Sequence, residues 1–236
     1  MPKINVYLPD ELAEGVKTAN LPVSAICQRA LEQSVRRVTA IRATVLGELD
    51  DPTAQLSQFT DRARTAVKLA ITKAREDGAA AVGTEHLLHG VLAEGANLAL
   101  KVLRAIEVEP AQVERALSKV MSGGGGEATR FSGPAANALE LTVTDAIALG
   151  HNYVGCEHLL IGLATEPDGT AGGVLRELGA DGRAVRRTVV AALSGYAHLR
   201  AQSPAPEAVI ASVVQQQLRP VLERLDRLES EPRTRN

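Results

Sequence analysis

The sequence predicts an all-α protein that carries one short β-strand near its N-terminus. Its 236 residues are 45% hydrophobic, yet five are aromatic and none is tryptophan, so Ala, Val, Leu and Ile must fill the core. Such an interior favours helices over a β-sandwich or a barrel. Two further observations agree. Apolar residues recur at helical spacing between capping residues and glycines, and one helical unit occurs twice.

The charge and the cysteines limit the classes of function. A formal net charge of −2 excludes bulk electrostatic binding to nucleic acid, although it leaves room for a local DNA-reading element. Cys27 and Cys156 form no CxxC motif, so we expect two reduced thiols in a cytoplasmic protein. The N-terminus has no apolar signal core, and no apolar run approaches the roughly 20 residues of a membrane span. We therefore expect no membrane partner.

The first predicted element is a strand. Residues 3–8 alternate polar and apolar side chains, so every second side chain shares a face. Pro9 ends the strand, because it has no N–H group for a ladder, and it suits the start of a helix. One helix follows, and a second begins at the capping residue Ser24 after a break at residues 20–22. The expected buried stripe of the second helix consists of Ile26, Ala30, Leu31, Val35 and Val38.

A lone strand needs a partner, and the simplest partner is the same strand of a second copy. The stretches KINVYLPDELAEGV and LPVSAICQRALEQSV resemble the ribbon-helix-helix family of DNA-binding regulators. The resemblance implies a homodimer whose paired strands enter the major groove of DNA. The outward strand residues that would contact bases are Lys3, Asn5 and Tyr7. The residues whose backbone amides would hold a DNA phosphate are Val23, Ser24 and Ala25.

A second interpretation of this segment stays open. Residues 1–40 carry five basic and four acidic groups, which is a small positive charge for a DNA-binding element. Tyr7 is also an unusual base reader, because it offers a single hydroxyl. On this interpretation the segment is a strand-swapped dimerisation device that binds no DNA. Both interpretations predict a dimer.

The rest of the chain is dominated by an internal repeat. Residues 59–117 align with residues 131–189 at a constant offset of 72 without a gap, and 21 of the 59 pairs are identical. The densest block is VGTEHLLHG at 82–90 against VGCEHLLIG at 154–162. Each copy is predicted to form four short helices, and two such copies should pack as a pseudo-two-fold pair that buries the apolar face of each.

Capping residues mark the predicted helix ends. Thr60 and Ser132 are the expected N-caps of the first helix in each copy, with Gly78 and Gly150 just past its end. Thr84 is the expected N-cap of the second helix. The predicted segments are a ribbon-helix-helix-like segment at 1–40, a helical linker at 41–57, a repeat domain at 58–196 with copies at 59–121 and 131–194, and an amphipathic helix at 207–229.

The paired motifs F-[TS]…A and G-[TC]-E-H-L-L-x-G resemble the N-terminal domain of the Clp-family unfoldases, ClpC above all, over about residues 57–195. A Clp unfoldase continues into ATPase modules with the motif GxxxxGK[ST]. This chain contains no Gly-Lys-Ser or Gly-Lys-Thr, and Glu127 follows the glycine run at residues 123–126. We therefore expect no ATP hydrolysis, no other enzymatic activity and no cofactor.

The resemblance also implies ligands. In the ClpC family this domain docks adaptors and substrates, some members bind phosphoarginine through the glutamate of each motif, and the domain is a target of cyclic-peptide antibiotics. The residues that the resemblance assigns to ligand binding are Thr84, Glu85, Cys156 and Glu157. Cys156 stands where the family has threonine, so the second site lacks a hydroxyl donor. The alternative is that Thr84 and Glu85 are only a cap and a first-turn residue.

His86 and His158 invite a metal or a general-base interpretation. Each is a single histidine in its copy, with no second ligand at i+4 and no triad partner, so we expect packed structural histidines. Cys156 has no identifiable base and is expected to be a core or capping thiol. The sequence thus predicts no catalytic residue and no metal site.

Two functions follow from these expectations. The first is a dimeric DNA-binding regulator of transcription whose Clp-like domain binds a peptide, degron or small ligand. The alternative is an adaptor or decoy that binds Clp substrates, adaptors or cyclic peptides, with the first forty residues only dimerising. The helix at 207–229, which Pro220 should kink or split, is either an assembly helix or a lid.

Overall fold

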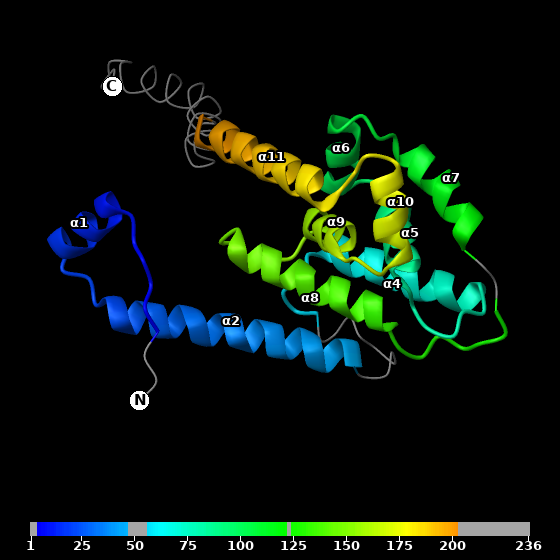
Figure 1. Ribbon diagram of the computed structural model, residues 1–236, viewed down its shortest axis with the longest axis horizontal. Coiled ribbons are helices and arrows are strands. Elements are labelled where there is room, and N and C mark those ends of the chain that lie inside the picture. The colour runs from blue at the N-terminus through cyan, green and yellow to red at the C-terminus, as the bar shows by residue number, and fades with distance from the viewer. Residues whose placement is uncertain (1–3, 47–55, 122–123, 203–236) are drawn as a thin grey trace, which may run out of the picture. The chain divides into compact units, whose positions relative to one another are not determined.

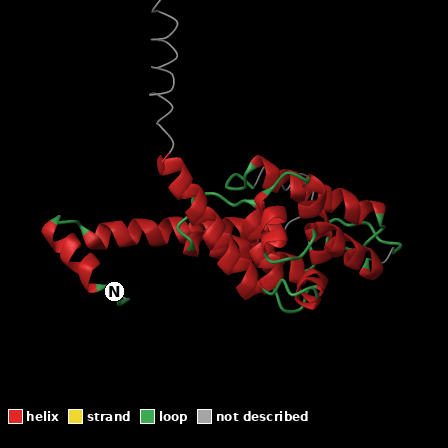
Figure 2. Ribbon diagram, turned by 90° about the horizontal axis from the view of Figure 1, so that it is seen from above, coloured by secondary structure: helices red, strands yellow, loops and turns green. Residues whose placement is uncertain are grey.

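The computed structural model describes residues 4–46, 56–121 and 124–202, which form helices and loops without an assigned strand (Figures 1 and 2). Two helices precede the repeats, α1 (Asp10–Thr18) and α2 (Val23–Leu46). Repeat one consists of α4 (Asp61–Glu76), α5 (Thr84–Glu94), α6 (Leu98–Ala105) and α7 (Pro110–Val120). Repeat two consists of α8 (Gly133–Ala148), α9 (Cys156–Thr165), α10 (Thr170–Glu177) and α11 (Gly182–Gln202).

The four helices of each repeat confirm the predicted duplication. In repeat one α4 packs chiefly on α5, and in repeat two α8 packs chiefly on α9. The same positions form the core of both repeats, and all of them are at most 1% exposed. These paired core residues are Val67 and Leu139, Leu88 and Leu160, Val91 and Leu163, Leu103 and Leu175, and Val113 and Val185.

Glycines let the first two helices of each repeat approach closely. A Cβ atom at Gly90 of α5 would lie 2.0 Å from the backbone oxygen of Ala66 in α4. A Cβ atom at Gly162 of α9 would lie 2.4 Å from the backbone oxygen of Ala138 in α8. Both distances are far inside van der Waals contact, so any other residue at these positions would push the helices apart.

Side-chain caps set where α4 and α8 begin. The Thr60 side chain accepts a hydrogen bond from the backbone N–H of Ala63, and Ser132 does the same for Ala135, as predicted. The prediction that Thr84 is the N-cap of its helix is wrong. Gly83 occupies that position with extended backbone angles, and Thr84 is the first helical residue.

The two repeats exchange short backbone pairings. Phe59 of repeat one forms a parallel bridge with Val154 of repeat two, and Val82 forms the equivalent bridge with Phe131. The bonds that make these bridges include Thr60 N–H to the Val154 oxygen at 2.9 Å and Ser132 N–H to the Val82 oxygen at 2.9 Å. Both phenylalanine side chains are buried. Each repeat therefore completes the backbone pairing of the other, as a pseudo-two-fold arrangement requires.

The predicted N-terminal strand is not present in the described residues. Residues 4–9 adopt no strand and lead into α1, because a strand exists only where another strand supplies hydrogen-bond partners, and the described chain offers none. The stripe expected to be buried is also largely exposed: Ile26 is 50%, Leu31 53% and Val35 62% accessible. The two predicted helices are present, although α2 runs without a break across residue 40.

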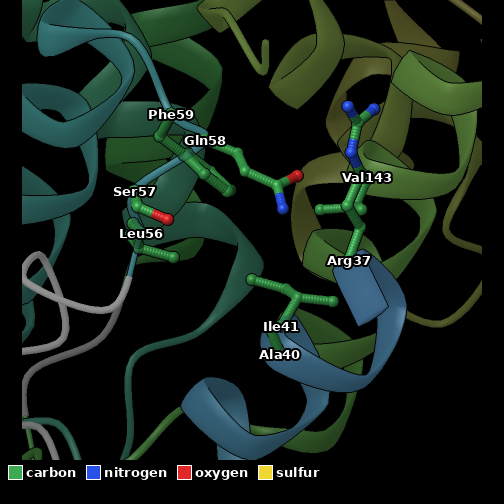
Figure 3. A pocket seen from close by; sticks show the side chains of 8 residues that line it. All are labelled: Arg37, Ala40, Ile41, Leu56, Ser57, Gln58, Phe59 and Val143. Atoms are coloured by element: carbon green, nitrogen blue, oxygen red, sulfur yellow. The ribbon is translucent and has the colours of Figure 1, made fainter. Parts of the chain in front are cut away.

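The second half of α2 packs on repeat two. Arg37 donates from Nη1 to the backbone oxygen of His151 at 3.1 Å, and Arg42 Nε lies 2.8 Å from the Glu140 carboxylate. Between these contacts Ile41 is only 4% exposed. A cavity of about 20 Å³ remains beside it (Figure 3), lined by Arg37, Ala40, Ile41, Leu56, Ser57, Gln58, Phe59 and Val143. The predicted helix at 207–229 lies outside the described residues, as does Lys3.

Candidate functional site

The candidate ligand-binding residues lie in two equivalent loops, at the starts of α5 and α9. In each loop a glycine is the N-cap, and the glutamate two residues later folds back over it. A Cβ atom at Gly83 would lie 2.1 Å from Oε1 of Glu85, and one at Gly155 would lie 2.3 Å from Oε1 of Glu157. The glycine therefore makes room for the carboxylate at the helix N-terminus, where the helix dipole favours negative charge.

A buried histidine holds each loop by a hydrogen bond to the N-cap glycine. Nδ1 of His86 accepts a hydrogen bond from the backbone N–H of Gly83 at 2.9 Å, and Nδ1 of His158 accepts one from Gly155 at 3.0 Å. Each ring is buried, with 5% of the His86 side chain and none of the His158 side chain exposed. Because Nδ1 is an acceptor, the proton of the neutral ring is on Nε2. Both histidines thus cap their own helix, which agrees with the predicted structural role.

In repeat one, Nε2 of His86 faces a carboxylate. It lies 3.7 Å from Oδ2 of Asp77, and Oδ1 of the same carboxylate is 2.5 Å from Nζ of Lys73. Asp77 Oδ2 is buried without a hydrogen-bond partner among the described residues. Burial lowers the pKa of His86, while the charges of Glu85 and Asp77 act in the opposite direction.

In repeat two, a second histidine takes the place of that carboxylate. Nε2 of His158 lies 2.8 Å from Nδ1 of His151, whose ring stacks on Tyr153 with centroids 5.3 Å apart. Burial, with a smaller contribution from His151, lowers the pKa of His158 to about 4. His158 is therefore neutral at physiological pH and donates from Nε2 to His151. The positions equivalent to His151 and Tyr153 in repeat one are Ala79 and Ala81.

The two glutamates differ in access to solvent. The Glu85 side chain is 21% exposed and that of Glu157 is 8% exposed. Their Oε1 atoms lie at similar distances from the adjacent histidine, 3.3 Å and 3.4 Å from Nδ1. Burial raises the pKa of Glu157, so the charged form that a cationic ligand needs is disfavoured there. Glu85 is the more available of the two carboxylates.

The residues before the glutamates are both buried, and they make different contacts. The hydroxyl oxygen of Thr84 accepts from the backbone N–H of Ala171 at 3.1 Å, so it caps α10 of the other repeat. Cys156 has no such role, because Asn97 caps the equivalent helix α6 by accepting from Leu100 N–H. Burial raises the pKa of Cys156 to about 12, with the charges of Glu94 and Glu157 adding to the shift. The thiol is therefore protonated at neutral pH and is not an activated nucleophile.

This fold and these motifs match one protein family. The model of the Clp repeat (R) N-terminal domain matches residues 58–128 and 130–227 of the chain. The chain belongs to the Clp N-terminal repeat family. The match begins after α2 and covers both repeats and the sequence up to residue 227, so the N-terminal segment lies outside the Clp N-domain.

Relatives of the Clp N-domain are parts of much longer proteins. A chloroplast protein of Solanum lycopersicum named ATP-dependent Clp protease ATP-binding subunit ClpA homolog CD4B is 40% identical over 144 residues, which cover 59% of this chain. The chloroplast chaperone protein ClpC1 of Arabidopsis thaliana is 40% identical over 142 residues, 58% of this chain. The chain spans about 15% of the length of these relatives.

A solved structure shares the fold. The N-terminal domain of Hsp104 from Candida albicans superimposes with a TM-score of 0.50 and 16% identity, covering 57% of this chain and 90% of that one. At this level of identity the likeness concerns the fold alone. It agrees with the two packed repeats of the Clp N-domain.

The residues predicted to contact DNA lie in the exposed N-terminal segment, away in sequence from the Clp N-domain. Asn5 is exposed, Tyr7 is 96% accessible, and Val23, Ser24 and Ala25 form the exposed start of α2. Within the ranges that the structure covers, no three His, Cys, Asp or Glu side chains are arranged to hold a metal ion. None of the helices in those ranges is both long and apolar enough to cross a bilayer.

Sequence reasoning missed the residues that distinguish the two loops of the Clp N-domain. Asp77, His151 and Tyr153 surround the buried histidines, yet none belongs to the repeated motif. A signal for them exists in the alignment of the repeats. Their counterparts are Leu149, Ala79 and Ala81, so each marks a position where the copies differ in chemistry beside an invariant histidine.

Proposed function

We propose that this chain is a non-catalytic binding protein of the Clp system, whose Clp N-domain engages protein substrates, adaptors or ClpC-directed cyclic peptides. The observation that carries the proposal is Glu85, a partly exposed carboxylate that Gly83 and His86 fix at the start of α5. The family membership and the similarity to the Clp ATP-binding subunits support it. The 236 residues contain no GKS or GKT motif, so the proposed role is binding without hydrolysis.

Glu85 suits a guanidinium or a phosphorylated guanidinium. The carboxylate pairs with the cation, and the first-turn amides of α5 are placed to receive phosphate oxygens. A loop held by its own glycine and histidine pays little entropy on binding, because the carboxylate is already oriented. The proposed ligand contact therefore rests on Glu85, while the buried Thr84 hydroxyl serves α10.

A titration with a peptide that contains phosphoarginine tests this function. We expect Glu85→Gln to weaken binding by about 10-fold to 100-fold, the range for losing one charge-assisted hydrogen bond. Glu76→Gln is the matched control, because Glu76 is an exposed carboxylate on α4, and it should bind as the natural chain does. Equal affinity of the Glu85→Gln variant and the natural chain would refute the assignment.

A second candidate function is favoured by the apolar surface of the N-terminal segment. Large apolar side chains there are between 39% and 78% accessible: Ile4, Val6, Leu8, Leu12, Leu21, Val23, Ile26, Leu31 and Val35. Monomeric proteins rarely expose such a run. A second copy would cover it and would supply the backbone partners that residues 4–8 lack. In that dimer Lys3, Asn5 and Tyr7 would face DNA, as the ribbon-helix-helix resemblance implies.

Two measurements separate the dimer from DNA binding. Sedimentation equilibrium should give a dimer that Ile26→Asp converts to a monomer, because a buried unpaired charge is costly. A gel shift with the upstream region of its own gene should occur with the natural dimer, and the Lys3→Ala, Asn5→Ala double variant should remain dimeric without shifting DNA. A dimer that shifts no DNA at low salt would leave dimerisation as the sole role of the segment.

A further inference from the structure

We infer that the two repeats have different roles. Repeat one presents the ligand-binding carboxylate, Glu85, whereas repeat two binds no ligand and anchors α2. The inference deepens the proposed function, since it takes the glutamate loops as the ligand site. It is carried by contacts around Glu157 that have no counterpart around Glu85.

Bulky rings stand beside Glu157 and not beside Glu85. His151 and Tyr153 stack on each other, and Tyr153 also lies edge-on to His158 at 5.5 Å between centroids. The phenol of Tyr153 is close enough to Glu157 for the charge of that carboxylate to contribute to a raised Tyr153 pKa, after the effect of burial. In repeat one the two ring positions are alanines, at Ala79 and Ala81. Repeat two therefore carries two rings at positions where repeat one has only methyl groups.

Glu157 is also poorly placed to attract a cation. The residue is 6% exposed, and its side chain 8%, against 21% for Glu85. A guanidinium that reached Glu157 would lose most of its hydration, because the carboxylate is buried. Cys156 adds no hydroxyl donor beside it. The loop of repeat two therefore retains the glutamate and the histidine at the start of α9. Its glutamate is too buried to offer a binding surface.

The same side of repeat two holds α2. Arg37 binds the backbone oxygen of His151, the residue whose ring pairs with His158. Arg42 binds Glu140 of α8, and Ile41 faces the space lined by Phe59 and Val143 (Figure 3). The residue equivalent to Glu140 in repeat one is Lys68, which would repel Arg42. The anchor therefore fits repeat two alone.

The equivalent place on repeat one is already filled by backbone. Gly124 N–H donates to the Asp77 oxygen at 3.0 Å, and Gly126 N–H donates to the Gly78 oxygen at 2.8 Å. A Cβ atom at Gly126 would lie 2.7 Å from Cα of Ala80. The segment at 124–126 thus covers the end of α4 in repeat one. The equivalent end of α8 in repeat two is contacted by α2.

Isothermal titration of the full chain with phosphoarginine tests whether only repeat one binds the ligand. We expect one molecule bound per chain, an affinity lower by about 10-fold to 100-fold in Glu85→Gln, and unchanged stoichiometry and affinity within 2-fold in Glu157→Gln. Two molecules bound per chain, or equal losses in both variants, would overturn the inference while leaving the proposed function intact. No binding by the natural chain would instead refute the proposed function.

Hydrogen exchange on the same proteins tests the anchor. Arg37→Ala removes the donor to the His151 backbone oxygen and should speed exchange of amides at residues 39–43 of α2. Arg36→Ala, the matched substitution at an exposed neighbouring arginine, should leave those amides unchanged. Circular dichroism and the unfolding midpoint establish that both variants are folded. Unchanged exchange in a folded Arg37→Ala variant would show that repeat two does not hold α2 through this contact.

Discussion

The two repeats share the same core and helix caps, and they differ in the side chains around the capping histidines. Both have the buried phenylalanine, the capping glycine and histidine, and the glycine at the crossing of their first two helices. Beside the histidine, repeat one carries Asp77 with two alanines, whereas repeat two carries His151 and Tyr153. The positions that the two repeats share are the ones that close packing constrains, and the positions at which they differ lie beside the capping histidines.

The largest expected effect tests whether the first two helices pack equally closely in both repeats. Gly90→Ala and Gly162→Ala should each lower the free energy of unfolding by about 3 kcal/mol, because each new methyl group would meet the backbone of the neighbouring helix. Urea denaturation measures the loss. Gly173→Ala in α10, where the new methyl meets nothing within 4 Å, should instead be neutral or stabilising by up to about 1 kcal/mol. A large loss in only one of the first two variants would break the comparison.

The second effect concerns pH and should be larger in repeat two. The folded chain keeps His158 neutral down to about pH 4, whereas the unfolded chain takes up the proton near the usual pKa of 6.5. Stability therefore falls as pH drops through this window, by about 2 kcal/mol between pH 7 and pH 5 from this group. His158→Asn should flatten the pH dependence in that window.

The matched variant is His86→Asn, which should flatten the dependence less. Burial lowers the pKa of His86 too, but Glu85 and Asp77 oppose the shift. Urea denaturation of both variants at pH 7, 6 and 5 gives the two slopes. Identical slopes would mean that the Asp77 and His151 environments are electrostatically equivalent after all.

A smaller effect tests the contact that crosses between the repeats. Thr84→Val removes the hydroxyl oxygen that caps α10 and should cost about 1 kcal/mol of stability, whereas Thr84→Ser retains the cap. Cys156→Val should cost less, because Asn97 already caps the equivalent helix. Thermal or urea unfolding of the three variants measures the difference. Equal losses for Thr84→Val and Thr84→Ser would exclude a capping role.

The smallest effect concerns the ion pair between α2 and α8. The side chains of Arg42 and Glu140 are 60% and 26% exposed, so the pair should contribute no more than about 0.5 kcal/mol. A double-mutant cycle with Arg42→Ala and Glu140→Ala gives the coupling energy. A coupling well above 1 kcal/mol would mean that the pair is a principal anchor of α2 rather than an addition to Ile41.

Local features of the fold could be predicted from the sequence. The offset of 72 identifies both repeats, and Thr60 and Ser132 were recognised as caps because a cap and its partner lie three residues apart. Thr84 was assigned wrongly for the opposite reason. Its partner, Ala171, lies 87 residues away and in the other repeat, so its role depends on tertiary packing. The predicted strand likewise fails within one chain, because its partner was expected from a second copy.

The candidate site could be predicted in part. The repeated motif identified Glu85 and Glu157 as candidates, but residue spacing alone cannot distinguish which of the two carboxylates is accessible to a ligand. Their difference in exposure is set by packing around each loop. His151 and Tyr153, which contact His158 in repeat two, lie outside the motif. The DNA-contact residues remain a prediction.

The reciprocal bridges between Phe59 and Val154 and between Val82 and Phe131 have an evolutionary consequence. A single repeat would leave both of these pairings unmade, together with the α10 amide that Thr84 satisfies from the other repeat. An ancestor with one repeat would have had to find a second molecule to complete them, at a rate and extent set by its concentration. Two copies in one chain make that encounter intramolecular. The two halves of such a chain need not be identical, and here they differ around the carboxylates.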